Sequence, residues 1–321
     1  MNLHNQEHST IKAPDISLVI PLLNEEESLP ELTKGIAQAL EAEYTFEIIF
    51  IDDGSTDASW SIISELKKKY VQVKGVRFRR NYGKSVALQA GFERALGTYV
   101  VTMDADLQDD PKEVPEMVQM LKDGDDLVSG WKQERYDPIS KTIPSKFFNF
   151  VTRKAAGIHL HDFNCGLKAY KQDVVKNIYV YGELHRYIPM LAKREGFTRI
   201  SEKVVTHHAR KYGHTKFGLS RFMNGFLDLV TLLFVQRYLQ KPMHFFGTVG
   251  VLLMLFGGGI NLYLAFIKLV LDIPLANRPL LYLGILLLVL GVQFFSTGLI
   301  GELINRNHVE HQKPQVREEI S

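Results

Sequence analysis

Residues 46–57 read FEIIFIDDGSTD, a short strand-forming run that ends in an acidic turn. Further short runs rich in β-branched residues stand at residues 16–22, 73–78, 98–103 and 126–130. Between these runs, apolar residues recur at helical spacing in residues 26–40, 58–70, 85–96 and 111–121. Strands that alternate with amphipathic helices predict a mostly parallel sheet covered on both faces, which is an open α/β fold.

Polar or acidic residues follow three of the predicted strands directly. They are Asn24-Glu25-Glu26 after the first strand, residues 52–57 after the second, and Asp104-Ala105-Asp106 after the fourth. In open α/β sheets the ligand site lies beyond the carboxyl ends of the strands, so the three clusters should converge there. Charged residues placed directly after buried strands are costly unless they have partners. The pattern therefore implies a cation or a ligand that supplies donors.

The Asp104-x-Asp106 pair has two interpretations. Two carboxylates at a strand end can place oxygens on one hard divalent cation, which can also hold the two phosphates of a nucleotide diphosphate. Gln108 could supply a third oxygen. The alternative is an acidic turn that caps the helix starting at Pro111. We assign the cap to Asp110 and the binding role to the aspartate pair.

The acidic turn after the second strand is open to the same two interpretations. It could be only a turn and cap for the helix that begins near Ala58, and Asp57 is assigned to that role. Asp53 could instead accept hydrogen bonds from a base N–H, with Asp52 supporting the loop.

Two phosphate-binding motifs are excluded by their spacing. Gly83-Lys84-Ser85 matches the end of a Walker A loop, but Phe78 stands where that loop requires an earlier glycine. No G-x-G-x-x-G follows the first strand either. These mismatches disfavour an ATPase or a dehydrogenase.

The composition excludes further classes. The chain has 321 residues, with 38 Lys plus Arg against 36 Asp plus Glu, and this balance argues against a nucleic-acid binder. Cys165 is the only cysteine, so no intrachain disulfide can form. The first fifteen residues lack the apolar core of a secretion signal. The sequence therefore predicts that the N-terminal domain stays in the cytoplasm.

Two apolar runs predict a membrane anchor. Residues 245–267 and 279–301 contain no Asp, Glu, Lys or Arg. As helices, each would be about 34 Å long, enough to cross a hydrocarbon core of about 30 Å. Lys and Arg near the runs number two before the first, two between them and three after the second. This distribution favours an inner-membrane protein with two spans and both termini in the cytoplasm.

The sequence thus divides into five segments. Residues 1–15 are expected to be a flexible N-terminus, 16–216 the α/β domain and 243–304 the two-helix anchor. Residues 217–242 carry apolar residues at helical spacing, which predicts juxtamembrane amphipathic helices or, alternatively, an ordinary domain helix. The chain after Glu302 is polar, and residues 305–321 are expected to form a mobile cytoplasmic tail.

Four motifs in the α/β domain resemble those of a known family. They are PLLNEEESLP at residues 21–30, IDDGSTD at 51–57, RNYGKSVALQAGFERALG at 80–97 and MDADLQDDP at 103–111. In this order and spacing they resemble the family 2 inverting glycosyltransferases of GT-A fold, and within them the polyprenyl-phosphate glycosyltransferases. GELHRYIP at 182–189 and the paired spans resemble the bacterial membrane-anchored subgroup. The resemblance implies a Rossmann-like, mostly parallel open sheet and a metal-dependent glycosyltransferase.

The resemblance also implies roles for individual residues. The nucleotide-sugar site would contain Pro21, Asn24, Glu25, Asp52, Asp53, Lys84, Asp104 and Ala105. Mg²⁺ or Mn²⁺ would be held by Asp104, Asp106 and Gln108. The acceptor phosphate would meet Lys141, Ser145, Arg135, Arg186 and Lys216. The catalytic set would be Asp106, Asp162 and Arg210. Trp131-Lys132-Gln133 stands where an arginine is often seen, which leaves the contacts of Lys132 and Arg135 open.

The chemistry of the acceptor decides whether a base is needed. A phosphate monoester has a second pKa of about 6, so it is mostly dianionic at neutral pH and needs no strong general base. A sugar hydroxyl would need a carboxylate within hydrogen-bond reach. Asp162 is the candidate for a base or sugar-orienting group, and the alternative is a fold-stabilising carboxylate beside Arg186 or a backbone turn. His159, His161, Asp162 and Cys165 are close in sequence, but their spacing fits no common zinc site.

The sequence is compatible with three functions. The leading hypothesis is inverting transfer of one sugar from a UDP-sugar such as UDP-glucose, or from GDP-mannose, to undecaprenyl or dolichyl phosphate at the cytoplasmic membrane face. The second is extension of a polysaccharide or lipid-linked glycan, although the Q-x-x-R-W motif of processive synthases is missing and Gln236-Arg237-Tyr238 is the nearest match. The third is a non-catalytic scaffold, against which the intact aspartates count.

The resemblance also bears on partners. It implies a small membrane flippase in the same pathway, and it leaves a homo-oligomer open. The sequence does not identify the sugar, the nucleotide, the metal or the lipid chain length.

Overall fold

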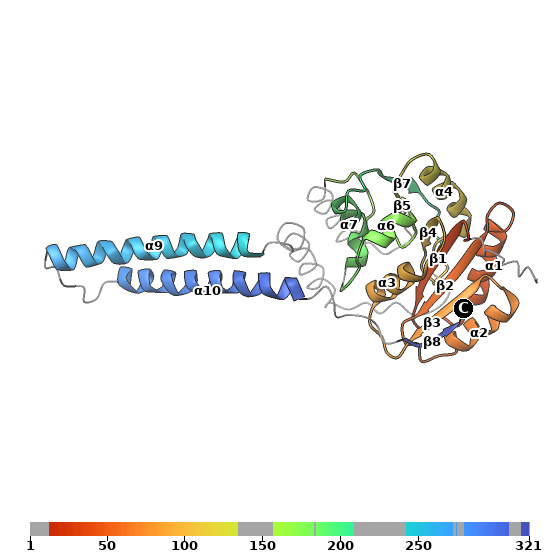
Figure 1. Ribbon diagram of the computed structural model, residues 1–321, viewed down its shortest axis with the longest axis horizontal. Coiled ribbons are helices and arrows are strands. Elements are labelled where there is room, and N and C mark those ends of the chain that lie inside the picture. The colour runs from red at the N-terminus through yellow and green to blue at the C-terminus, as the bar shows by residue number, and fades with distance from the viewer. Residues whose placement is uncertain are drawn as a thin grey trace, which may run out of the picture. The chain divides into compact units, whose positions relative to one another are not determined.

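The computed structural model describes residues 13–133, 157–182, 184–208, 242–271, 274, 279–307 and 316–320. It divides into two compact units, Met1–Phe222 with Pro314–Ser321, and Met223–Lys313. The first unit is an α/β domain, and the second contains two long helices (Figure 1).

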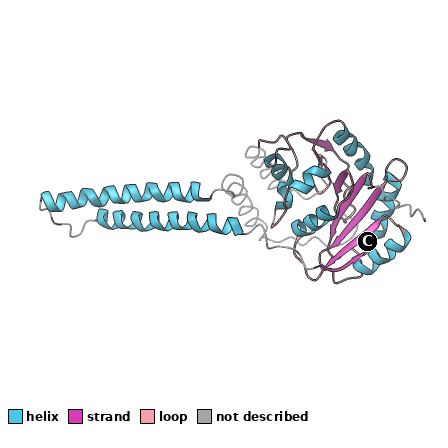
Figure 2. Cartoon of the chain, in the orientation of Figure 1, coloured by secondary structure: helices cyan, strands magenta, loops and turns pink. Residues whose placement is uncertain are grey.

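The first unit is built on one mixed sheet, drawn in magenta in Figure 2. Its strands are β1 (Ile16–Leu22), β2 (Phe46–Asp52), β3 (Val73–Phe78), β4 (Tyr99–Thr102), β5 (Leu127–Trp131), β6 (Lys168–Lys171), β7 (Ile200–Val204) and β8 (Val316–Ile320). They lie in the order β7-β5-β6-β4-β1-β2-β3-β8. The β1–β2, β2–β3, β1–β4 and β5–β7 pairs are parallel, whereas β6 and β8 pair antiparallel with their neighbours. The predicted open, mostly parallel sheet is confirmed.

Helices cover both faces of this sheet. One layer contains α1 (Leu29–Leu40), α2 (Ser59–Lys69), the 3₁₀ turn η1 (Pro111–Glu113) and α4 (Val114–Lys122), and α3 (Lys84–Arg94) packs against β1 and β2. The remaining elements are α6 (Gln172–Asn177), η2 (Leu184–Tyr187) and α7 (Ile188–Arg194).

Strand β1 supplies apolar side chains to both layers. Successive side chains of a strand point to opposite faces of the sheet. Leu18 and Ile20 belong to the core that also contains residues of α1 and α2, whereas Val19 faces α3. A nearly continuous apolar run is therefore what a strand in the middle of a covered sheet requires.

The layer that contains α3 lies very close to the sheet. A Cβ atom added to Gly91 of α3 would come within 2.2 Å of the Cγ1 atom of Val19. Only a glycine allows this separation, so α3 packs directly on β1. Its first residue, Lys84, follows the loop at the carboxyl end of β3.

The predicted cap at Asp110 is confirmed, whereas the N-cap of α2 is Ala58 and not Asp57 as predicted. The predicted element ends hold to within a few residues. The Asp110 side chain accepts a hydrogen bond from the Lys112 N–H at 3.0 Å, at the start of η1. Asp57 Oδ1 accepts from the Ser59 N–H at 3.0 Å, at the start of α2. The short helix α6 was not predicted from the sequence.

The prediction of a mobile tail is wrong for residues 316–320. These residues form β8, which pairs antiparallel with β3 and places Glu318 opposite Arg77. The side chain of Glu319 also forms an ion pair with Arg94 at 2.8 Å. The physical reason is the edge of β3, which offers unpaired backbone groups to any extended segment that reaches it.

The second unit consists of α9 (Pro242–Val270) and α10 (Pro279–Asn307). Their apolar parts, Met243–Val270 and Pro279–Leu303, have mean hydropathies of 2.0 and 2.2 and are long enough to span a membrane. Large apolar side chains on them are exposed, including Phe256 at 67% and Leu269 at 83%. Such exposure is typical of a lipid-facing surface. The juxtamembrane helices were predicted over 217–242; residues 217–241 lie outside the described residues, and Pro242 is the first residue of α9.

Glycines bring α9 and α10 together. Added Cβ atoms at Gly250 and Gly257 would each lie 2.7 Å from a carbonyl oxygen of α10, that of Gly291 and that of Gly284 respectively. Gly250 and Gly257 are seven residues apart on α9, as are Gly284 and Gly291 on α10, so each pair lies on one face of its helix. Small residues at a helix interface let the helix backbones pack closely in a membrane.

Candidate active site

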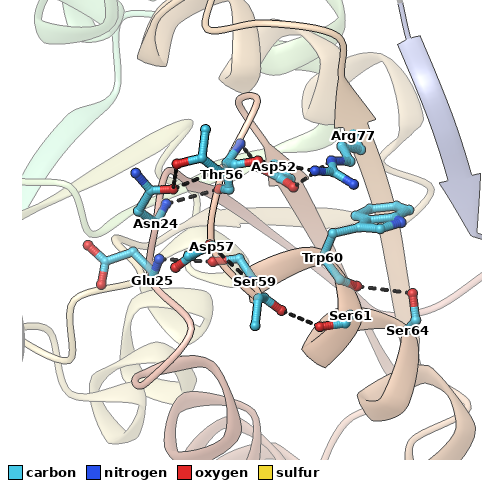
Figure 3. Close-up of polar contacts among 12 residues, drawn as sticks. Asn24, Glu25, Asp52, Thr56, Asp57, Ser59, Trp60, Ser61, Ser64 and Arg77 are labelled. Atoms are coloured by element: carbon cyan, nitrogen blue, oxygen red, sulfur yellow. Dashed lines mark hydrogen bonds and ion pairs between the residues drawn. The ribbon is translucent and has the colours of Figure 1, made fainter.

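The loops after β1 and β2 are joined by hydrogen bonds (Figure 3). Asn24 Oδ1 accepts from the Thr56 N–H at 2.9 Å, and the Asn24 N–H donates to Ser55 Oγ at 2.9 Å. Asn24 has a φ of 57°, a left-handed conformation that asparagine tolerates better than most residues. The two loops therefore form one polar rim at the carboxyl ends of β1 and β2.

The same rim continues to the start of α2. The Glu25 N–H donates to Ser59 Oγ at 3.0 Å, and the Ala58 N–H donates to Glu26 Oε2 at 2.7 Å. Because these bonds use backbone groups of one loop and side chains of the other, neither loop can shift without the other.

Asp52 supports the second loop, as expected from the sequence. Its buried side chain accepts from the Ser55 N–H at 2.7 Å and lies 3.4 Å from Arg77 Nε. Arg77 also donates to the Ser55 carbonyl at 3.1 Å and lies over the Trp60 ring (Figure 3). Arg77 on β3 thus contacts both the first and the last residue of the turn from Asp52 to Ser55.

Asp53 connects this loop to the start of α3. Its two carboxylate oxygens accept from the Tyr82 and Gly83 N–H groups at 2.7 and 2.9 Å. Burial raises the pKa of Asp53, and the two backbone hydrogen bonds oppose that shift. Gly54 has a φ of +79°, and an added Cβ would lie 2.6 Å from the Arg80 backbone. The contact of Asp53 with a base stays a prediction.

Asp104 lies beyond the end of β4 beside a lysine. Its Oδ1 is 2.5 Å from the Nζ atom of Lys84, the first residue of α3. A Cβ atom at Gly166 would lie 2.5 Å from Asp104 Oδ2, so glycine is required there. Burial raises the pKa of Asp104, but Lys84, Lys132 and Lys168 outweigh it and lower that pKa to about 2. The carboxyl is therefore ionised at neutral pH.

Asp106 and Gln108 belong to a tight turn. The Gln108 N–H donates to Asp106 Oδ1 at 3.3 Å, and Leu107 between them has a φ of 60°. The Gln108 carbonyl accepts from the His208 N–H at 2.9 Å. The segment that follows β7 therefore runs along this turn, two residues before Arg210 in the sequence.

The turn after β4 carries the oxygen donors that a hard divalent cation prefers. Asp104 and Asp106 offer carboxylate oxygens two positions apart after the strand end, and Gln108 offers an amide oxygen. Among the described residues, no group of three or more His, Cys, Asp or Glu is placed to hold a metal. A protein that supplies one or two carboxylates, with substrate phosphates completing the shell, is the usual arrangement for Mg²⁺.

Several residues near this site were missed by sequence reasoning. Lys168 is buried on β6, and its Nζ donates to the Phe163 and Cys165 carbonyls. Lys132 was not missed: the sequence left its contacts open, and it forms an ion pair with buried Asp109 at 2.7 Å. Only the strand pairing reveals Lys168, because the β4–β6 register places it opposite Thr102.

His185 was also missed. Its Nδ1 lies 3.0 Å from Ser85 Oγ, and its own backbone N–H donates to that oxygen at 3.1 Å. Burial, together with Lys84, Arg186 and Lys168, lowers the pKa of His185 to about 3. The GELHRYIP motif was the available signal, although only Arg186 within it was selected.

The other predicted residues lie in different surroundings. Pro21 is half-buried in β1, and Ala105 is buried, so Ala105 can offer a ligand only its backbone. Asp162 is buried and accepts from the Asn164 N–H at 3.0 Å, as the backbone-turn alternative expects. Arg186 lies in η2. The remaining predicted residues, Arg135, Lys141, Ser145, Arg210 and Lys216, lie outside the described residues.

The zinc alternative gains no support. The Cys165 thiol is buried, and burial raises its pKa to about 12. His161 forms an ion pair with Glu202 and stacks on Trp131.

Several known proteins are similar to this chain in sequence over most of its length. The sequence model of the family "Glycosyl transferase family 2" matches residues 17–179. The chain is 39% identical over 307 residues to dodecaprenyl-phosphate galacturonate synthase of Rhizobium johnstonii, covering 93% of this chain and 90% of that one. It is 35% identical over 295 residues to undecaprenyl-phosphate 4-deoxy-4-formamido-L-arabinose transferase of Pseudomonas aeruginosa, covering 91% and 85%.

A solved structure supports the fold. Glucosyl-3-phosphoglycerate synthase from Mycobacterium tuberculosis, crystallised with Mn²⁺ and UDP-glucose, matches with a TM-score of 0.53 and 21% identity. The match covers 70% of this chain and 79% of that one.

Proposed function

The chain belongs to glycosyltransferase family 2, and we propose that it transfers one sugar from a nucleotide-diphosphate sugar to a polyprenyl phosphate with inversion. The observation that carries this proposal is the Asp104/Asp106 pair after the end of β4, which Lys84 and Gly83 connect to Asp53 in the loop after β2. Beyond the carboxyl ends of parallel strands is where such a fold binds its ligand.

The donor half of the reaction needs relief of negative charge on the departing diphosphate. Mg²⁺ or Mn²⁺ bound by Asp104, Asp106 and Gln108 would supply electrostatic stabilisation there. The Mn²⁺ in the similar solved structure supports a divalent cation without distinguishing the two metals. The joined loops would hold the nucleoside through Pro21, Asn24, Glu25 and Asp53, with Asp52 and Arg77 keeping the turn in place.

The acceptor half follows from the relatives and the anchor. Both named relatives act on polyprenyl phosphates, and both are covered by this chain over most of their length. The two apolar helices would keep the enzyme at the bilayer, where such an acceptor resides. A phosphate nucleophile is already dianionic, so no general base is required, and the buried turn position of Asp162 suits a structural role. We assign the acceptor phosphate to Lys141, Ser145, Arg135, Arg186 and Lys216, and we keep Arg210 in the proposed catalytic set.

The location follows from connectivity. The chain leaves the sheet domain before α9 and returns to it as β8 after α10. If both helices span the membrane, the domain and both termini lie on one side, which we propose is the cytoplasmic face of the inner membrane. The proposal leaves a homo-oligomer open, and it includes a separate small membrane flippase in the same pathway.

A transfer assay tests this function. Membranes that contain the protein receive undecaprenyl phosphate and radiolabelled nucleotide sugars, including those of galacturonate, glucose and mannose, and butanol-extractable label is counted. Label in the lipid phase that disappears in Asp106→Ala supports the proposal. Label only in polymer would favour a polysaccharide-extending transferase. No label with any donor would favour a non-catalytic role.

A further inference from the structure

We propose that Lys84 holds the metal-binding oxygen of Asp104 in the free enzyme, so that the cation and the nucleotide diphosphate bind in a coupled manner. This inference rests on the proposed function, since it concerns the same site. The ammonium group of Lys84 lies 2.5 Å from Asp104 Oδ1. A divalent cation placed on that oxygen would stand directly beside a like charge.

Asp104 cannot easily move to avoid this conflict. It lies two residues after the end of β4, and its carboxylate packs against the backbone at Gly166 with no room for a Cβ atom. The two side chains are similarly exposed, 35% for Lys84 and 32% for Asp104, but Lys84 has the longer and more flexible side chain and can move. Gly83 before it has a φ of +93° and open space beside it.

The neighbouring lysines are less able to exchange partners. Lys132 is paired with buried Asp109, and Lys168 donates to two backbone carbonyls. Among these described cations, Lys84 is the one whose partner is the proposed metal ligand. A diphosphate that enters the site offers Lys84 a new anionic partner, and Asp104 Oδ1 is then released for the cation.

Thermodynamic linkage makes this idea measurable. If Lys84 suppresses cation binding in the free enzyme and the diphosphate draws Lys84 away from Asp104, nucleotide strengthens cation binding. The cation must then strengthen nucleotide binding by the same factor. Phosphate oxygens that bind the metal directly would contribute to this factor as well. The distinguishing quantity is therefore the affinity for cation alone.

The experiment is a Mn²⁺ titration of the purified full chain, followed by electron paramagnetic resonance, without nucleotide and with UDP or GDP. We expect Lys84→Met to bind Mn²⁺ alone at least fivefold more tightly than the wild type, and to show a smaller gain on adding nucleotide. Lys84→Arg keeps the charge and should behave like the wild type. Lys68→Met, which removes an exposed charge on α2, is the matched control.

The outcomes separate this inference from the proposed function. Unchanged or weaker Mn²⁺ binding by a folded Lys84→Met would overturn the inference while leaving the site intact. If Lys84→Met does not fold, Lys84→Gln serves as the neutral variant under the same criterion. Mn²⁺ binding that persists in Asp106→Ala, or is missing from the wild type with nucleotide, would overturn the proposed site and this inference with it.

Discussion

At the scale of single residues, Arg77 shows how a side chain outside the site can position it. It contacts Asp52 and the Ser55 carbonyl, which form the turn that receives Asn24. Hydrogen bonds to charged groups contribute about 1.5–3 kcal/mol. We expect Arg77→Ala to raise the KM for nucleotide sugar roughly tenfold with a smaller change in kcat. Exposed Arg79→Ala is the control, and equal effects of both variants would contradict this role.

His185 predicts a dependence of stability on pH. Its pKa is about 3 in the folded chain and about 6.5 when unfolded, so between these values the unfolded chain binds a proton that the folded chain does not. The lowered pKa of His185 therefore contributes to the free energy of unfolding above pH 6.5. This contribution is lost as pH falls toward 3, by at most about 1.4 kcal/mol per pH unit. The thermal midpoint of His185→Asn should therefore fall less than that of the wild type between about pH 6.5 and about pH 4.5. Exposed His159→Asn should follow the wild type, and a His185→Asn curve parallel to the wild type would refute the assignment.

At the scale of elements, the α9–α10 pair depends on glycine at defined positions. Gly257 faces the Gly284 carbonyl, whereas nothing lies within 4 Å of a Cβ at Gly259. We expect Gly257→Leu to separate the helices and lower the thermal midpoint in detergent, while Gly259→Leu leaves it unchanged or higher, since glycine costs a helix about 1 kcal/mol. Equal behaviour of the two variants would contradict the close packing.

Some secondary-structure elements could be predicted from local sequence patterns, and others could not. Local patterns predicted β1, β2 and β3 and the cap at Asp110, because each depends on neighbouring residues. They did not predict β8, since its pairing depends on the free edge of β3, which is distant in the sequence. For the same reason, motif order selected Asp104 and Asp106 only as candidate ligands, and the pairing of Asp104 with Lys84 depended on the placement of α3 over β1.

At the scale of the whole molecule, the connectivity predicts the membrane topology. Cys165 is buried, so a single introduced cysteine can be labelled selectively. A membrane-impermeant maleimide should label Ala276→Cys, between the helices, in intact cells, and Ser321→Cys only after lysis. Labelling of both positions in intact cells would contradict two spans with a cytoplasmic C-terminus.

The most direct measurement of the central claim is a crystal structure of the enzyme with UDP and Mn²⁺, in which anomalous scattering locates the metal. We predict one Mn²⁺ bound by Asp104 and Asp106 and bridged to the diphosphate, with Lys84 moved away from Asp104. A metal and nucleotide bound at any other place in the domain would contradict this claim.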